Sequence, residues 1–317
     1  PVDAVRRSGE DELAEVLDAE RRGDGARRQA LFERHHHPQG PLYQSLGEPE
    51  AAVAWTEPPP VPRASGAPAF GVVAATDGSY RFFNGDEQFD VWPTYGASLQ
   101  GWSVAGHELI ADRLRTQRRQ LLPPGGYRSY SSLGGLRPIW ALGTHSNPSI
   151  LWHYPYAARI VESGPDRVVA EFTRDFAHVA IRIRVGMERG VPGFRYDVRG
   201  INRLDHARVA FNFNLPLTLR RSDVEGMALR WRGEGGASCE TTIARERVSA
   251  FAVPARGPLT VAGTAWTLEI EADPAETALY FVDWGPGFIT PDVHGAYRPR
   301  AVNEEVTTTW RFTCRPV

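Results

Sequence analysis

At 317 residues, the chain has room for one large domain or two ordinary ones, and in either case for a sizeable hydrophobic core. Its apolar content of 42% and its formal net charge of −2 are typical of a soluble globular protein and give no electrostatic basis for binding nucleic acid or an anionic membrane. All 36 basic residues are arginine, which excludes a Schiff-base lysine, a P-loop lysine and a lysine general base.

The first 68 residues are expected to form two segments outside the main domain. Residues 1–37 predict a short helical extension, because Ser8 followed by Asp11 resembles a capping box. The run of three histidines at its end fits an exposed helix terminus better than a metal site. Residues 38–68 are rich in proline, glycine and glutamate, which predicts an extended linker.

From residue 69 onward the pattern changes to short strands separated by turns, and it holds to residue 317. Asp77-Gly78 between two apolar runs indicates a hairpin. The sequence shows no βαβ rhythm, no G-x-G-x-x-G motif and no repeat period, so many short antiparallel strands with almost no helix predict an all-β fold, a large β-sandwich over residues 69–317. The expected strands include Phe70–Ala74, Tyr80–Phe83, Ala157–Val161, Arg167–Arg174, Val179–Arg189, Gly193–Asn202, Ala207–Leu219, Ala228–Trp231, Val248–Val253, Trp266–Ala272, Ala278–Trp284 and Val306–Cys314.

The strand and turn signals are clearest in residues 89–114. A strand that begins at Val91 meets Pro93, and Gly96 gives the backbone room to bend. A second strand follows through Trp102, and Ala105-Gly106 turns the chain into a short apolar strand.

This stretch resembles the opening of aldose 1-epimerase-like (galactose mutarotase-like) domains. The resemblance implies a large antiparallel supersandwich over roughly residues 70–314 and a carbohydrate-like small-molecule ligand, with no cofactor. In such domains the glutamate of an L-E-P tripeptide is the catalytic base. The matching residue here is Thr290, which cannot act as a general base. The matched pattern consists of Pro93, Gly96, Ala97, Leu99, Trp102, Gly106, Glu108, Leu109 and Ile110.

Mutarotation needs one group to take the proton of the anomeric hydroxyl and another to protonate the ring oxygen. Asp292 and His294, expected in a loop just after Thr290, are two residues apart and could face the same cleft. An Asx-type turn with an exposed histidine is the alternative. His145 in a long loop and His153 in an aromatic segment are the other catalytic candidates, and the resemblance places a substrate-facing histidine near His153.

The predicted substrate-binding residues are of two kinds. Arg182 and Arg184 alternate with apolar residues in a strand, so both should lie on the solvent or cleft face, where their guanidinium groups would suit acidic sugars. Aromatic rings can pack on the apolar faces of a sugar. The aromatic candidates are Trp152, Tyr156, Trp284 and Tyr127.

The function predicted from the sequence is aldose 1-epimerase-like acid/base isomerisation of a sugar or another polyhydroxylated substrate. A non-catalytic carbohydrate-binding or regulatory protein is the first alternative, and a lyase or a biosynthetic cyclase or isomerase on the same scaffold is the second. No metal site is assigned. Because the sequence has no apolar span and no signal-peptide core in residues 1–23, a cytoplasmic protein is expected.

The oligomeric state is left open by the sequence. Cys239 and Cys314 are too few for a disulfide framework, and either one bridge or two reduced thiols fits the pattern.

Overall fold

The computed structural model describes the strand-rich part of the chain. Its described residues are Arg22 and 69–110, 135–136, 139–142, 147–148, 155–175, 179–203, 210–220, 224–233, 236–243, 251–255, 258–273, 277–282, 288–294, 298–299 and 301–317. The predicted helical extension (1–37) and linker (38–68) lie outside these residues, apart from Arg22.

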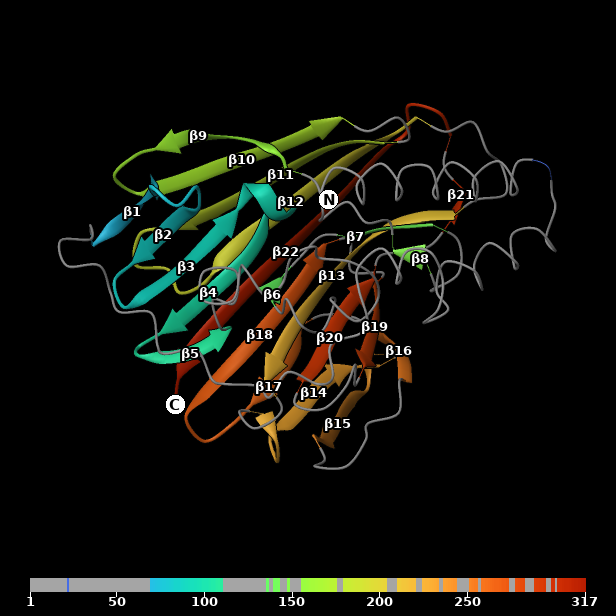
Figure 1. The fold of residues 1–317 in the computed structure, drawn as a ribbon. Helices are drawn as coiled ribbons and strands as arrows, with labels where there is room; N and C mark the ends of the chain where they lie inside the picture. The colour runs from blue at the N-terminus through green and yellow to red at the C-terminus, as the bar shows by residue number, and fades with distance from the viewer. Residues whose placement is uncertain are drawn as a thin grey trace, which may run out of the picture.

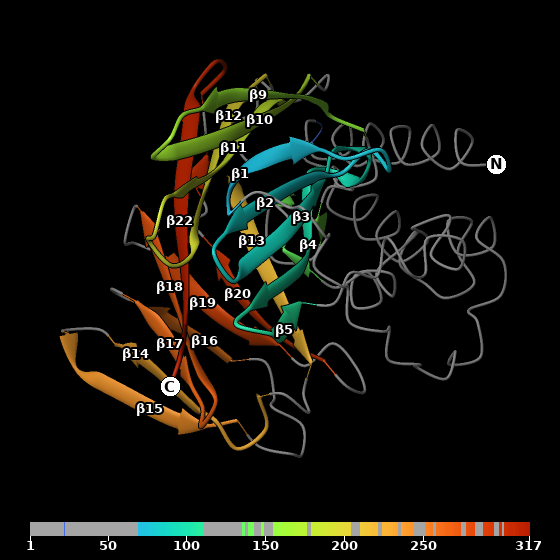
Figure 2. The same ribbon diagram turned by 90° about the vertical axis from the view of Figure 1, so that its left-hand side faces the viewer.

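The described strands form two antiparallel sheets that pack face to face (Figures 1 and 2). The first sheet has 13 strands, nine of which follow the order β1, β2, β3, β4, β6, β13, β20, β19, β16. The remaining four pair at its side, β5 with β4, β7 and β21 with β13, and β8 with β7. Its strands are β1 (Phe70–Ala74), β2 (Tyr80–Asn84), β3 (Glu87–Trp92), β4 (Ser98–Val104), β5 (His107–Ile110), β6 (Gly135–Leu136), β7 (Ile139–Leu142), β8 (Asn147–Pro148), β13 (Ala210–Arg220), β16 (Phe251–Ala255), β19 (Thr277–Val282), β20 (Phe288–His294) and β21 (Arg298–Pro299).

The second sheet has nine strands in the order β15, β14, β17, β18, β22, β12, β11, β10, β9. The strand that comes last in the chain, β22, therefore lies in the middle of this sheet, between β18 and β12 (Figure 1). Its strands are β9 (Ala157–Ser163), β10 (Arg167–Asp175), β11 (Val179–Glu188), β12 (Phe194–Asn202), β14 (Ala228–Arg232), β15 (Ser238–Thr242), β17 (Leu259–Ala262), β18 (Trp266–Asp273) and β22 (Glu305–Pro316).

The strands and turns predicted for residues 89–110 are confirmed, except that the first strand, β3, begins at Glu87 and not at Val91. After β3, a 3-10 turn over Pro93–Tyr95 ends at Gly96, which is left-handed with φ 64°, and the next residue, Ala97, is also left-handed with φ 56°. The buried hydroxyl of Tyr196 donates a 2.9 Å hydrogen bond to the carbonyl of Ala97. This contact from the other sheet holds the bend where the sequence pattern places it.

Aromatic side chains fill the space between the sheets where β3 and β4 face β12 and β22. The ring of Phe194 lies 4.7 Å from Phe89, 5.0 Å from Trp102 and 5.0 Å from Phe312, centroid to centroid. All four side chains are almost fully buried. Burial of each contributes roughly 1.5–3 kcal/mol, and the ring contacts add about 0.5–1.5 kcal/mol per pair.

A polar clasp joins the turn between β2 and β3 to the turn between β11 and β12. The side-chain amide of Asn84 donates to the carbonyls of Glu188 and Val191, and its oxygen accepts from the backbone N–H of Gly190. Glu87 accepts a 2.9 Å hydrogen bond from Trp102 Nε1 and a 2.7 Å bond from the backbone N–H of Gly193.

Glu87 is a buried carboxyl in this clasp, and its setting changes its acidity. Burial raises the pKa of Glu87, and the hydrogen bonds from Gly193 and Trp102 only partly offset that effect. Because both oxygens accept a donor, the clasp satisfies the buried group while tying the two sheets together.

The strand prediction is confirmed for most of the chain from residue 70, including the hairpin of β1 and β2, in which Ala74 pairs with Tyr80. Seven strands were missed, namely β6, β7, β8, β15, β17, β20 and β21, and the first three of these lie in the long loop expected around His145. Within the described residues no helical segment has the length and hydropathy needed to cross a membrane. Cys239 and Cys314 are both free thiols.

Candidate functional site

Five of the ten predicted site residues can be placed. Tyr156, Arg182 and Arg184 are described with their side chains, and Asp292 and His294 by the backbone of their strand. The other five fall outside the described residues, namely Tyr127, His145, Trp152, His153 and Trp284.

Asp292 and His294 lie in strand β20, so the prediction that they belong to a loop is wrong. Pro291 and the glycine after His294 suggested a turn, but β20 is paired on both sides. Its pairing with β13 skips Thr290 and Pro291, which is the expected local effect of a proline that has no N–H to donate. A single proline therefore interrupts one ladder without ending the strand.

The face of the 13-stranded sheet on which these positions lie follows from strand register. Leu99, Leu136 and Leu217 are paired in one row across β4, β6 and β13, and Leu99 is fully buried in the core. The odd-numbered positions of β13 and the residues paired with them therefore share the core-facing side. Every odd-numbered position of β13 and β20 is apolar, as that assignment requires.

After Phe288, the even-numbered positions of β20 are polar and lie on the opposite face. Thr290, Asp292 and His294 follow each other at intervals of about 6.7 Å along the strand. His294 is paired with Asn214 of β13, and Asp292 with Tyr280 of β19. We call Thr290, Asp292, His294 and Asn214 the β20 stripe. By register, an aspartate, a histidine and an asparagine occupy neighbouring positions on one face of the sheet.

Asn214 was missed by the sequence prediction. The signal was present, because AFNFNLPLTLR alternates apolar and polar residues across β13. What the sequence alone lacked was the pairing of β13 with β20, which brings Asn214 beside His294.

The predicted alternation of β11 is confirmed. Ile181, Ile183 and Val185 are buried, whereas the side chains of Arg182 and Arg184 are 46% and 50% exposed. Both arginines lie on the outer face of the nine-stranded sheet. The structure therefore does not bring them to the β20 stripe, which belongs to the other sheet.

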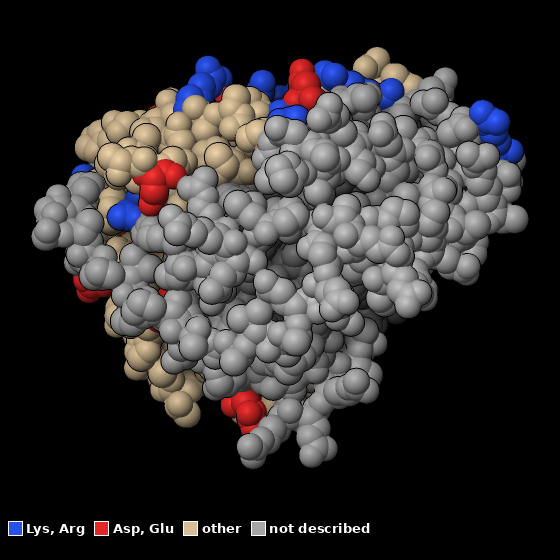
Figure 3. Space-filling view, in the orientation of Figure 1, with Lys and Arg blue, Asp and Glu red and all other residues tan. Residues whose placement is uncertain are grey.

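The outer face of the nine-stranded sheet carries charged residues in cross-strand rows. One row runs from Arg159 through Glu171, Arg184 and Asp197 to Thr309, so opposite charges are neighbours along most of it. In Figure 3, blue side chains predominate along the upper edge of the molecule, with red between them near its centre.

Glu171 is the centre of this charged face. Its side chain is only 1% exposed, yet Arg159 donates two hydrogen bonds of 3.1 and 2.6 Å to Oε1 and Arg184 donates one of 2.9 Å to Oε2. Arg182 forms a longer ion pair of 3.6 Å with the same Oε2. Burial acts to raise the pKa of Glu171, but the hydrogen bonds and the nearby positive charges outweigh it, so this pKa lies below its usual range.

Glu171 should make the stability of the protein sensitive to acid. Because its pKa is lower in the folded state than in the unfolded chain, its contribution is complete above the ordinary glutamate range and is lost as pH falls through the lowered folded value. We expect Glu171→Gln to cost about 1–3 kcal/mol of unfolding free energy near neutral pH. The difference from wild type should shrink as the pH falls below the ordinary glutamate range, in urea titrations followed by circular dichroism.

Glu162→Gln is the matched control for this measurement. Glu162 forms a 3.5 Å ion pair with Arg167 in the same pair of strands, but both side chains are largely exposed. Its substitution should change stability by less than about 1 kcal/mol at every pH. A Glu171→Gln effect that does not vary with pH would contradict the assigned role of the carboxylate.

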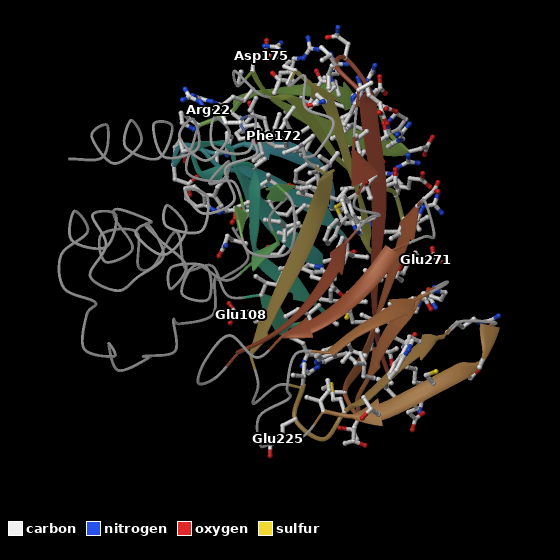
Figure 4. The ribbon with its side chains drawn as sticks, turned by 90° about the vertical axis from the view of Figure 1, so that its right-hand side faces the viewer. Arg22, Glu108, Phe172, Asp175, Glu225 and Glu271 are labelled. Atoms are coloured by element: carbon white, nitrogen blue, oxygen red, sulfur yellow. The ribbon has the colours of Figure 1, made fainter. Side chains whose placement is uncertain are left out.

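A surface pocket of about 630 Å³ opens beside Glu171. The pocket lies at the edge of the sheet where β10 and β12 end and β9 and β11 begin. Figure 4 shows Asp175, one of its lining residues, at the upper margin of the molecule. Phe172 of the same strand lies deeper inside. The lining of the pocket consists of Arg159, Glu171, Thr173, Asp175, Ala180, Ile181, Arg182, Arg199, Ile201 and Arg203.

Two further groups are unsuited to contact a substrate. Tyr156 is 5% exposed and packs in the core. Burial, with a smaller contribution from the charge of Glu87, raises the pKa of the Cys314 thiol to about 12, so this thiol stays protonated and is a poor nucleophile. Among the residues with described side chains, no three His, Cys, Asp or Glu residues are grouped so that they could hold a metal ion.

No protein-family model matches the sequence, and a search of curated proteins finds no match. Solved structures match the fold. A protein from Escherichia coli K12, provisionally described as an aldose 1-epimerase, gives a TM-score of 0.55 at 9% identity, over 75% of this chain and 99% of its own. The Slr1438 protein from Synechocystis sp. PCC 6803 gives 0.52 at 11% identity, over 78% and 96% of the two chains. The α-galactosidase AgaA of Geobacillus stearothermophilus gives 0.51 at 8% identity, over 75% of this chain and 40% of its own.

These similarities establish the fold. The chain has the galactose mutarotase-like β-sandwich fold that the stretch 89–110 predicts. The same architecture occurs in a part of an α-galactosidase, so the fold does not decide the chemistry. The chemistry depends on the residues that the sheets bring together.

Proposed function

We propose that the protein binds a carbohydrate-like, polyhydroxylated small molecule at the β20 stripe and isomerises it by aldose 1-epimerase-like acid/base chemistry. One observation carries the proposal: strand register places Asp292 and His294 on one face of β20, beside Asn214. The similarity of the fold to a structure provisionally described as an aldose 1-epimerase supports the choice of substrate class.

The stripe contains the residue types that mutarotation needs. A carboxylate takes the proton from the anomeric hydroxyl, the bond between the anomeric carbon and the ring oxygen breaks as the carbonyl forms, and an acid protonates the ring oxygen. Ring closure on the other face of the carbonyl reverses these transfers and gives the other anomer. We assign the base to Asp292 and the acid to a histidine, with His153, His145 and His294 as the candidates.

The position of Asp292 also supports its role in place of Thr290. Moving two residues along a strand keeps a side-chain position on the same face, whereas moving one residue transfers it to the other face. A base at Asp292 is therefore displaced by about 6.7 Å from Thr290 without leaving the polar face. The aromatic residues Tyr127, Trp152 and Trp284 are proposed to pack against the sugar.

Anomer interconversion provides the test. Freshly dissolved α-D-galactose and α-D-glucose should approach anomeric equilibrium faster with the protein than in buffer, as followed by proton NMR. Buffer at the same pH and a heat-inactivated sample are the controls, since mutarotation also proceeds spontaneously. An unchanged rate for a panel of aldoses would reject the isomerase.

A non-catalytic carbohydrate-binding protein is the second candidate, and Thr290 is the observation that favours it. Threonine in place of a glutamate at the expected base position leaves a polar group that can bind a hydroxyl but cannot take its proton. Saturable binding of a sugar, detected by calorimetry, without faster anomer interconversion would select this function.

A further inference from the structure

Two arginines are direct neighbours in the pocket beside Glu171. The cross-strand row that crosses the pocket runs from Thr173 through Arg182 and Arg199 to Thr307. Like charges directly opposite each other on paired strands are destabilising, and the adjacent row avoids this by alternating arginine with glutamate and aspartate. An anion between Arg182 and Arg199 would remove the repulsion.

The hydrogen-bonding groups of these arginines are incompletely used. Within the described part of the chain, the guanidinium of Arg182 donates no hydrogen bond, and its ion pair with Glu171 is 3.6 Å long. Arg199 bonds Glu305, which does not line the pocket. Each guanidinium has five N–H donors in a planar fork, so Arg182 and Arg199 both retain donors for a ligand.

The balance of charge in the lining favours a ligand with a single negative charge. Arg159, Arg182, Arg199 and Arg203 bring four positive charges to the lining. Glu171, Asp175 and Glu305, which bonds Arg199, bring three negative charges, so one positive charge is left over. A carboxylate can bind a guanidinium bidentately. The two acidic side chains of the lining would repel a multiply charged phosphate or sulfate, but they can accept hydrogen bonds from hydroxyl groups, as can the hydroxyl of Thr173.

We propose that this pocket binds a carboxylate-bearing sugar of the uronate class, at a second site separate from the β20 stripe. Arg182 and Arg199 hold the carboxylate, and Glu171, Asp175 and Thr173 accept hydrogen bonds from the hydroxyls. A volume of about 630 Å³ is in the range of small-molecule sites. None of the described residues in the lining has an aromatic side chain on which a nucleobase could stack. The inference does not depend on the acid/base function, because the pocket belongs to the nine-stranded sheet.

The test compares D-glucuronate with D-glucose by isothermal titration calorimetry on the full chain at constant ionic strength. The two sugars share the same ring and differ in the carboxylate at carbon 6. Glucuronate should bind at least about tenfold more tightly than glucose, the range that one charge-assisted pair supplies. Arg182→Gln and Arg199→Gln should each weaken glucuronate by about tenfold or more and leave glucose binding unchanged.

Arg311→Gln is the matched control, because it removes the same charge from the same sheet face. Arg311 lies on β22 opposite Arg195, a second pair of neighbouring arginines, and does not line the pocket. It should change glucuronate affinity by less than about twofold, since exposed charges outside the site are screened.

Circular dichroism should show that Arg182→Gln remains folded, because nearly half of that side chain is exposed. Arg182→Lys provides a second variant that keeps the charge and loses the planar fork, and it should also weaken glucuronate.

Four results would overturn the proposal. They are the absence of glucuronate binding, equal affinity for glucuronate and glucose, equal losses in Arg182→Gln and Arg311→Gln, and sulfate binding as tightly as glucuronate. The last result would reduce the pocket to a site for any oxyanion. Asp292→Asn should lose the anomer-interconversion activity and keep glucuronate binding, so failure of one proposal is distinguishable from failure of the other.

Discussion

Gly193→Ala is expected to destabilise the protein by more than about 4 kcal/mol, in the exceptional range for a single substitution. Gly193 has a φ of +94°, and a Cβ added there would lie 1.9 Å from the carbonyl oxygen of Phe312. That atom is backbone in the central strand β22, so it cannot swing away as a side-chain end could. The backbone N–H of Gly193 also donates to Glu87, so any shift of the turn strains the clasp as well.

Gly190→Ala separates steric crowding from backbone strain in this experiment. Gly190 lies in the same turn with a φ of +71°, but a Cβ added there meets nothing within 4 Å. Its substitution should cost only the left-handed conformation, about 1–2 kcal/mol. Urea unfolding monitored by tryptophan fluorescence measures both variants. Equal destabilisation of the two would mean that the close approach of Gly193 to β22 does not exist in solution.

Asp292→Asn should lower the rate of anomer interconversion by about 10²- to 10⁴-fold, provided that the protein is the proposed isomerase. This loss corresponds to about 3–5 kcal/mol of transition-state stabilisation. The asparagine is close in size and keeps hydrogen-bonding capacity but cannot accept the proton, so the effect should fall mainly on kcat. NMR exchange measurements at saturating sugar determine it.

Thr290→Val is the matched control on the same strand face. It removes a hydroxyl two residues from Asp292 and retains a β-branched side chain that suits a strand. Its kcat should change by less than about tenfold, because threonine cannot act as the base. A loss in Thr290→Val as large as that in Asp292→Asn would assign both effects to disturbance of β20 and remove Asp292 as the base.

Local patterns in the sequence predict the elements of this fold well. The turn at Gly96, the strand through Trp102 and the outward position of Arg182 each depend on a few neighbouring residues, and all three are confirmed. Strand β20 was missed because it is short and contains Pro291. Apart from that proline, only Phe288, Ile289 and Val293 are apolar. Proline is a strong strand-breaking signal in isolation, but two flanking strands override it here.

The sequence pattern could not predict which residues of distant strands pair with one another. Nothing near Glu171 indicates that Arg159 and Arg184 converge on it, because that requires the register of β9, β10 and β11. The pairing of Asn214 with His294 likewise joins residues 80 positions apart. The alternation of apolar and polar residues along a strand determines which face of the sheet a residue occupies. Its neighbour on the adjacent strand depends on how the whole sheet pairs and packs.

The central position of β22 imposes an order on the maturation of the protein during synthesis. Every other described strand leaves the ribosome before Glu305–Pro316, yet β12 and β18 cannot be joined until that segment arrives between them. Until then the two halves of the nine-stranded sheet each present an unpaired edge, the kind of surface that recruits strands from other chains. Nascent chains should therefore depend on chaperone protection until β22 has been synthesised, and substitutions that slow the docking of β22 should reduce yield more than they reduce the stability of the finished molecule.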